Sequence, residues 1–431
     1  MLLSQSSDAV LHRRLSVGLE AAVTAPAAVA RVALTVHQDL ETVADDWRGF
    51  EKEADCTAFQ TFAWHAAWQK HIGGPCGVRP AVVVGRERDR VLVIMPLAIE
   101  PGRLARRLVW HGSDLCDYNA PLLAHDFSEQ LDGTQFVALW AEVEQHLRAD
   151  PHLRYDVVVL ESMPEVVGVQ PNPFRHLPLS RNPSSAYLMN IEGEWDQFYK
   201  HKRSSATRRH DRSKRKRLAA AGPVNFVTAT EPCQIEKTLD TLFAQKAASF
   251  ELRGVPNFLA RPGYRAFFRD IAANPLSRCL VHVSRLEVGA VTAAANFGLI
   301  WRRRYYHVIA SYDAGVLSRF GPGTAHLHEL ICYALQRGCT EFDFTVGDEP
   351  YKRDWCDREL KLYDLRAAAT ARGWIVAWVS AAANRLKRLV KHTPALWRTF
   401  RRGRLIMARL KGTKATDEPD RKVIDNPGGE A

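Results

Sequence analysis

The segment FDFTVGDEPYKRDW, residues 342–355, gathers ionisable side chains directly after a predicted strand. Phe342 and Phe344 alternate with Asp343, which is the period of a strand with one buried face. Two carboxylates, a tyrosine, a lysine and an arginine follow between residues 348 and 353. A turn requires the glycine and the proline of this segment but not such a density of ionisable groups. The segment is therefore a candidate site for proton transfer.

A second candidate site is the loop SRFGPG, residues 318–323, which precedes a predicted amphipathic helix beginning at Gly323-Thr324. Gly321 and Gly323 would leave backbone N–H groups open to a ligand, and the positive end of the helix dipole favours an anion such as a pyrophosphate. Arg319 would add a charge-assisted hydrogen bond. The alternative is a plain strand-to-helix turn, for which the same glycines supply tight geometry.

Histidine and cysteine do not form a recognisable metal site. His326 and His328 are two residues apart and face different directions on a helix. His328 and Cys332 share a face but lack a third ligand. The eight cysteines show no CxxC pair and no zinc-like spacing, so we expect no metal and free thiols in a reducing cytoplasm.

The length and the charge of the chain limit the number of domains and the class of partner. The chain of 431 residues is long enough for two domains. Lys and Arg exceed Asp and Glu by 59 to 48, a net charge of +11, which indicates an anionic partner: nucleic acid, a membrane surface, or a phosphorylated substrate or cofactor. No run of 18 uncharged apolar residues predicts a membrane span. Residues 1–29 do not resemble a secretory signal, so we expect a disordered leader.

Two halves repeat a similar order of strands and helices. Residues 30–175 predict an N-terminal domain and residues 176–380 a C-terminal one, joined by an Asn/Pro-rich linker around 168–184. The second half contains a long predicted helix at 195–221 and closes with a strand pair over 361–379. This order indicates an α/β (α+β) fold with mixed central sheets. A basic helical extension at 381–413 and a disordered tail at 414–431 follow.

The chain resembles the GNAT acetyltransferase domain of CelD/BcsL-type proteins, which are associated with cellulose and exopolysaccharide biosynthesis. The resemblance is strong over 184–372 and weaker over 30–175. The matching residues are Tyr312-Asp313, Gly321-Pro322-Gly323, Gly338, Phe342-Asp343-Phe344, Gly347-Asp348 and Glu349-Pro350-Tyr351-Lys352. FemAB peptidoglycan-bridge enzymes are related double-GNAT proteins. The resemblance implies tandem GNAT-like domains, the first degenerate.

The resemblance also implies acetyl-CoA or another acyl-CoA as co-substrate, with Arg319, Gly321, Gly323 and Thr324 at its pyrophosphate. In the superfamily a Gln or Arg opens this loop; here Ser318 stands at that position.

Acyl transfer from a thioester requires deprotonation of the acceptor, stabilisation of an oxyanion and departure of a thiolate. On the GNAT-like fold, we assign Asp348 as base or acceptor-orienting group and Tyr351 as donor to the leaving sulfur. Lys352 would hold the acceptor or the oxyanion. The alternative is a turn in which Asp348 caps a helix starting at Glu349-Pro350.

Residues 200–218 hold ten Lys or Arg and one Asp. The charges of this predicted helix have three alternative interpretations. They are exposed to solvent, they bind the 3′-phosphate of the coenzyme or an anionic glycan, or they bind nucleic acid. No aromatic residues interleave with the charges, which argues against single-strand stacking. Lys202 and Arg203 are expected to face the cleft between the domains. From the N-terminal half, Asp117 and Tyr118 are expected to contribute to the acceptor site.

Three functions remain. The first is acyl-CoA-dependent N- or O-acyl transfer to a saccharide or sugar-nucleotide intermediate of envelope polysaccharide synthesis. The second is a FemAB-like aminoacyl transferase that uses aminoacyl-tRNA. The third is a non-catalytic scaffold whose basic segment, residues 385–411, docks on a membrane or a synthase complex. We expect a cytoplasmic protein, peripheral to the inner membrane face if that segment docks.

Overall fold

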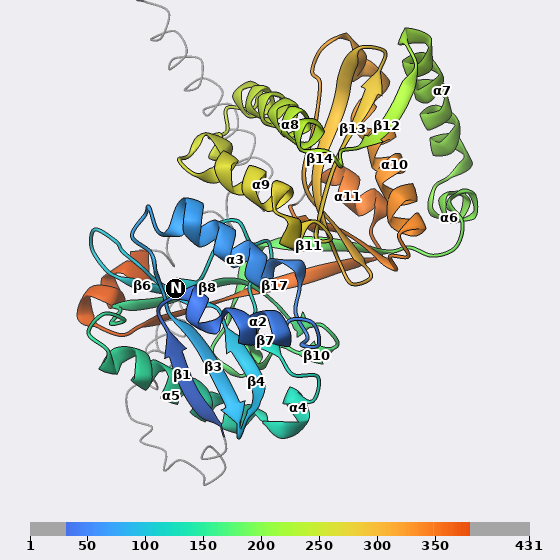
Figure 1. The fold of residues 1–431 in the computed structure, drawn as a ribbon. Helices are drawn as coiled ribbons and strands as arrows, with labels where there is room; N and C mark the ends of the chain where they lie inside the picture. The colour runs from blue at the N-terminus through green and yellow to red at the C-terminus, as the bar shows by residue number, and fades with distance from the viewer. Residues whose placement is uncertain (1–31, 348, 380–431) are drawn as a thin grey trace, which may run out of the picture.

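The computed structural model describes residues 32–347 and 349–379, and most of its strands join one mixed sheet that runs through both halves (Figure 1). Eleven strands form this sheet in the order β12-β13-β14-β15-β16-β11-β17-β8-β6-β5-β2. A second sheet of four strands, β1-β3-β4-β7, belongs to the N-terminal half alone.

From residue 32 onward, the N-terminal half is built from short strands and four α-helices. The helices are α2 (Ala44–Phe50), α3 (Phe62–Trp68), α4 (Phe127–Gln130) and α5 (Gly133–Ala149). The strands are β1 (Ala33–His37), β2 (Arg79–Pro80), β3 (Val82–Glu87), β4 (Arg90–Met95), β5 (Leu97–Glu100), β6 (Arg107–Trp110), β7 (Leu122–Leu123), β8 (Val157–Pro164), β9 (Val166–Val167) and β10 (Gln170–Pro171).

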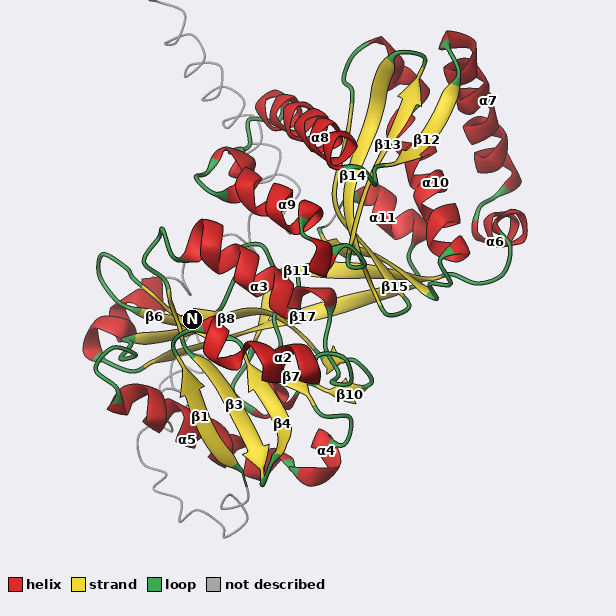
Figure 2. Cartoon of the chain, viewed as in Figure 1, coloured by secondary structure: helices red, strands yellow, loops and turns green. Residues whose placement is uncertain are grey.

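The C-terminal half carries longer strands with helices on both faces (Figure 2). The helices are α6 (Trp195–Lys202), α7 (Ser205–Ala221), α8 (Pro232–Leu252), α9 (Tyr264–Ala273), α10 (Pro322–Gln336) and α11 (Pro350–Trp355). The strands are β11 (Ser180–Asn190), β12 (Val224–Thr228), β13 (Val281–Val288), β14 (Val291–Trp301), β15 (Arg304–Tyr312), β16 (Glu341–Val346) and β17 (Arg358–Ala368).

The two halves are joined by strand exchange rather than by a simple linker. β17 is the last strand of the described chain, yet it pairs with β11 on one side and with β8 of the N-terminal half on the other. A shared apolar core continues this junction, because Phe59 and Tyr118 from the first half pack against Tyr306 from the second. Trp64 from the first half likewise packs against Phe267 from the second. The segment predicted as a linker, 168–184, is folded: it contains β10 and the start of β11, and Phe174 is fully buried.

Two predicted elements differ from the structure. The helix predicted over 195–221 is broken into α6 and α7, because Ser204 caps α7: its side chain accepts the N–H of Thr207. The closing strand pair was wrong, because only β17 is a strand. Residues 371–379 are helical, and the Thr370 hydroxyl accepts the N–H of Gly373 at the start of that turn. The expected leader, basic extension and tail lie outside the described residues.

No helix in the described part of the chain is long and apolar enough to cross a bilayer.

Candidate active site

The parallel strands β15 and β16 pair over three positions and then separate. Arg304, Tyr305 and Tyr306 face Glu341, Phe342 and Asp343 in turn. Beyond this point β15 continues beside β14, whereas β16 pairs with β11 on its other side. Within the described residues, the edge of β15 after Tyr306 therefore has no partner strand. Backbone groups left open at the carboxyl end of parallel strands are available to a bound ligand.

The glycine loop lies at this same end of the sheet, between β15 and α10. Gly321 has φ +66°, a conformation that strains any residue with a Cβ, and it occupies the cap position of α10. Among the described residues no side chain caps this helix, and Pro322 takes its first position. The N–H groups of Gly323 and Thr324 belong to the first turn, which has no acceptor inside the helix. The geometry is that of an anion site.

The basic helix α7 packs against this loop and against α10. The Lys214 side chain reaches over the loop: its Nζ lies 3.6 Å from the place where a Cβ on Gly321 would be. Arg215 forms an ion pair with Glu329 of α10, and both basic residues line a small pocket with Gly321 and Thr324. α7 thus adds positive charge to the positive end of the α10 dipole.

Lys352 of α11 lies beneath the end of β16. Its buried ammonium donates to the Val346 carbonyl at 3.1 Å and forms an ion pair with the Glu349 carboxylate at 3.1 Å. Gly347 has φ +143°, and a Cβ there would lie 2.8 Å from Lys352 Nζ, so the turn requires glycine. Lys352 therefore fixes the turn that carries the carboxylates. Asp348 lies outside the described residues, and its predicted role stays a prediction.

Asp117 arrives at this turn from the N-terminal half, in the loop that follows β6. Burial raises the pKa of its carboxyl to about 7, against the opposing effect of the Lys352 cation. The negative charges of Asp343 and Glu349 raise it further. A carboxyl with a pKa near neutrality is suited to take a proton from an acceptor group.

Tyr118, the next residue, contacts the end of β16. Its buried hydroxyl donates to Asp343 Oδ1 at 2.7 Å, and the same oxygen accepts the Thr345 N–H at 2.7 Å. Thr345 is held at φ +57°, and its hydroxyl donates to the His307 carbonyl where β15 and β16 part. Tyr118 therefore orders the strand end that carries Thr345, and its hydroxyl has a protein partner.

Two further groups at the site were not predicted from the sequence. Lys246 of α8 donates from Nζ to the Ala310 carbonyl of β15 at 2.9 Å, and burial lowers its pKa to about 8. Burial lowers the pKa of His307 to about 3, so its imidazole is neutral between the Lys352 and Lys246 cations. Both residues lie on elements with ordinary amphipathic patterns, and only the fold brings them to the turn after β16.

The other predicted residues have local partners. Lys202 forms an ion pair with Asp357 at 2.5 Å, and the Arg203 guanidinium lies 4.8 Å from the Trp355 ring centre. Both anchor α6 to the segment around α11, and their binding of substrate stays a prediction. The Arg319 guanidinium stacks on Phe320 at 4.8 Å. The Tyr351 ring meets Phe344 edge-on at 6.1 Å, and burial raises the pKa of its phenol.

His326 and His328 face different neighbours, as predicted. His326 Nε2 lies 3.2 Å from Ser284 Oγ, whereas the His328 ring packs 5.4 Å from Trp195. Burial lowers their pKa values to about 3 and about 4. In the described ranges no three His, Cys, Asp or Glu side chains are grouped to hold a metal ion.

Comparison with known proteins agrees with this geometry. Residues 205–353, from α7 into α11, match the family described as "Acetyltransferase (GNAT) domain". No curated protein matches the chain significantly.

Solved structures resemble the chain over both halves. FemX is 10% identical with a TM-score of 0.54, covering 77% of this chain and 96% of its own. L-PGS from Bacillus licheniformis is 12% identical with a TM-score of 0.47, covering 81% and 97%. A tandem GNAT protein from the clavulanic acid biosynthesis pathway is 15% identical with a TM-score of 0.41, covering 78% and 98%. Of these three, only FemX has a TM-score high enough to support a shared fold.

The predicted α/β fold with GNAT-like architecture is thereby confirmed. Domains of the matched family use acyl-CoA as co-substrate. Residues 205–353 match a GNAT acetyltransferase domain, and the protein is an acyltransferase.

Proposed function

We propose that the protein transfers an acyl group, acetyl in the simplest case, from acyl-CoA to an amine or hydroxyl of a saccharide or sugar nucleotide in exopolysaccharide or envelope biosynthesis. The assignment of acyl-CoA as donor is supported by the glycine loop before α10, which has no side-chain cap and lies where β15 and β16 separate, within the matched domain. The acceptor class rests on the resemblance to CelD/BcsL-type proteins.

The donor would bind with its pyrophosphate at Gly321, Gly323 and Thr324, with Lys214 and Arg319 adding positive charge. Its thioester would follow the open edge of β15, where unpaired N–H groups are available to the carbonyl oxygen as charge develops on it. An acyl group placed there lies between the strand edge and the turn that carries Lys352.

Asp117 would take the proton of the acceptor, because its pKa of about 7 leaves much of the carboxyl ionised at neutral pH. The new carbon–nitrogen or carbon–oxygen bond forms as the carbon–sulfur bond breaks. Tyr351 is the candidate proton donor to the departing thiolate; its raised pKa keeps the phenol protonated at neutral pH. Lys352 acts by holding the turn, since its ammonium already has protein acceptors.

The test is release of free coenzyme A from acetyl-CoA in the presence of amino sugars, neutral sugars and sugar nucleotides, followed as new thiol. Gly323→Trp is the blocked control, since a Cβ at this position already lies 3.3 Å from Tyr312. Acceptor-dependent thiol release by the wild type and none by Gly323→Trp supports the proposal. Absence of acetyl-CoA binding in both proteins contradicts it.

A second candidate is aminoacyl transfer from aminoacyl-tRNA. It is favoured by the fold similarity to FemX across both halves and by the charge of the segment 200–218. RNA bound by α7 would dissociate steeply as salt rises, because each phosphate contact releases counterions. Salt-sensitive tRNA binding without acetyl-CoA binding would select this candidate over the first.

A further inference from the structure

A short helical segment at the end of the described chain exposes a stripe of large apolar side chains. Trp374, Ile375, Trp378 and Val379 are 55%, 58%, 64% and 54% exposed. Positions four apart are neighbours on a helix surface, so Trp374 adjoins Trp378 and Ile375 adjoins Val379, and these two pairs form the exposed side of the segment. Contiguous exposed apolar surface marks an interaction site. We call this surface the aromatic stripe.

The aromatic stripe is anchored to the N-terminal half through Asp156. The Asp156 carbonyl accepts the N–H of Ala369, and its carboxylate accepts the Thr370 hydroxyl at 2.8 Å. A Cβ on Gly373 would lie 1.7 Å from the Asp156 carbonyl oxygen, so this segment meets the backbone there directly. The other carboxylate oxygen of Asp156 accepts the Arg106 N–H at 2.8 Å. Arg106 and the start of the helical segment are thus neighbours.

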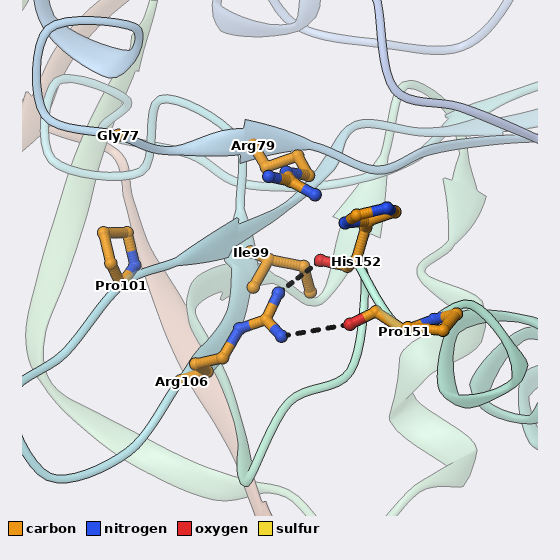
Figure 3. Close-up of a pocket in the computed structure, with 7 residues that line it drawn as sticks. All are labelled: Gly77, Arg79, Ile99, Pro101, Arg106, Pro151 and His152. Carbon is orange, nitrogen blue, oxygen red and sulfur yellow. Dashed lines mark hydrogen bonds between the residues drawn. The ribbon is translucent and has the colours of Figure 1, made fainter.

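Arg106 also lines an open pocket of about 350 Å³ at this end of the molecule (Figure 3). Arg79 and His152 lie at the same pocket, and Figure 3 shows the Arg79 guanidinium turned toward the His152 ring. Arg106 donates to the carbonyls of Pro151 and His152, which holds it in place. The residue Leu104, between the pocket residues Pro101 and Arg106 in sequence, is 77% exposed. This end of the fold therefore combines cationic and apolar groups.

The sequence beyond the aromatic stripe has the same character. Residues 385–411, which begin six positions after Val379, hold ten Lys or Arg and no Asp or Glu. A surface that joins tryptophans with an excess of cations matches the boundary of an anionic bilayer, where indole rings sit among headgroups and each cation near the surface adds attraction. A second copy of this chain would meet the same positive charge and be repelled.

We propose that the aromatic stripe and the Arg79–Arg106 pocket form a docking surface for a membrane containing anionic phospholipid. The stripe enters the interfacial region, and the pocket takes a lipid phosphate. The inference is independent of the acyl donor and acceptor.

The experiment is flotation of the full chain with vesicles of phosphatidylcholine alone or with 30% phosphatidylglycerol, the latter a test composition of about one anionic lipid in three. The wild type should bind only the anionic vesicles and be released by high salt. Trp374→Ser/Trp378→Ser should bind at least about tenfold more weakly, since two partly buried indoles are lost. The matched control is Leu252→Ser/Leu276→Ser, which removes side chains 69% and 78% exposed in the C-terminal half and should bind like the wild type.

Arg79→Gln tests the pocket separately and should weaken binding about fivefold, the worth of one cation near an anionic surface. All variants should retain the circular dichroism of the wild type. The proposal is overturned if the wild type ignores anionic vesicles, or if the double tryptophan variant binds them as the wild type does. A wild-type dimer that the tryptophan variant dissociates, with no vesicle binding, would assign the surface to a second copy and also overturn it.

Discussion

The eleven-stranded sheet contains two parallel strand pairs of the same design, one in each half. In the C-terminal half β15 and β16 pair over three positions and are connected through α10. In the N-terminal half β6 and β8 also pair over three positions, Arg107 to Val109 with Val157 to Val159, and are connected through α5. The repeat inferred from element order is visible here as matching pairs. They differ in how their helices begin.

The start of α5 is closed, whereas the start of α10 is open. Asp132 caps α5, accepting the N–H of Gln135, and the Gln135 side chain returns the contact in a capping box. A Cβ on Gly133 would collide with the His176 ring, so protein covers this helix end. α10 begins with Gly321 and has no such cap in the described chain. The same strand–helix–strand arrangement therefore leaves the first amides of α10 open to an anion, whereas Asp132 accepts a hydrogen bond from the first turn of α5.

The connection between strand and helix differs as well. In the C-terminal half it runs from Asp313 to Gly321 and contains a 3-10 helix, Val316–Phe320. In the N-terminal half it runs from His111 to Asp132 and carries Asp117 and Tyr118 into the C-terminal half, where they meet Thr345 and Asp343. The half whose helix start is capped thus supplies a candidate base to the half whose helix start is open. Four variants test this division of labour.

The largest effect is expected for Asp117→Asn. Removing a general base should lower kcat/KM about 100- to 10,000-fold, while acetyl-CoA binding is retained. Because the carboxyl must be ionised to act, wild-type kcat/KM should rise with pH through an apparent pKa near 7, and this limb should vanish in the variant. An unchanged pH profile would remove Asp117 from the mechanism.

Lys352→Met should act on both stability and pH dependence. It leaves the Val346 carbonyl without its donor, which costs about 1–3 kcal/mol of unfolding free energy. It also removes a cation that lowers the pKa of Asp117, so residual activity should titrate at higher pH. Lys246→Met is the comparison variant, because it removes a neighbouring buried cation whose ammonium donates to the Ala310 carbonyl of β15 rather than to the turn after β16. If the rise of kcat/KM with pH shifted equally in both variants, Lys352 would not be the cation that lowers the pKa of Asp117.

Acid should destabilise the N-terminal half through a buried histidine pair. His65 Nδ1 and His111 Nδ1 lie 3.0 Å apart, and burial lowers the pKa of His111 to about 3. Histidine in the unfolded chain binds protons below about pH 6.5, so this contribution to stability is full above that pH and is lost as pH falls toward 3. His111→Gln should reduce the slope at pH 5 by about 1.4 kcal/mol per pH unit. If thermal melts gave the same slope of unfolding free energy against pH for the wild type and the variant, His111 would not be a source of the acid sensitivity.

The smallest effect is expected for Asp132→Ala. Loss of this cap should cost about 1 kcal/mol of unfolding free energy, because the first-turn amides of α5 lose their acceptor. Acetyl-CoA binding should be unchanged in calorimetry. A loss of coenzyme binding would show that the α5 end also serves the donor.

Local sequence patterns predicted α10, the glycine loop before it and the strand β16, since each depends on residues within one or two turns. The prediction that only one face of β16 is buried was wrong, because Asp343 is buried as fully as Phe342 and Phe344. They did not predict that β17 inserts between β11 and β8, because strand order depends on pairing between distant segments. The Tyr118–Asp343 hydrogen bond spans 225 residues and had no local signal. Asp117 was assigned to the acceptor site, but its raised pKa depends on burial that only the fold creates. The positive φ of Thr345 could not be predicted from the sequence either, because threonine seldom adopts this conformation.

The most direct test of the account is calorimetric titration of acetyl-CoA into the wild type, Gly321→Ala and Gly338→Ala. Both glycines have positive φ, +66° and +72°, so both variants carry similar backbone strain at opposite ends of α10. The account predicts micromolar binding by the wild type, binding within about threefold of it for Gly338→Ala, and at least about tenfold weaker binding for Gly321→Ala. Equal affinities in all three proteins would contradict a donor site at the open end of α10.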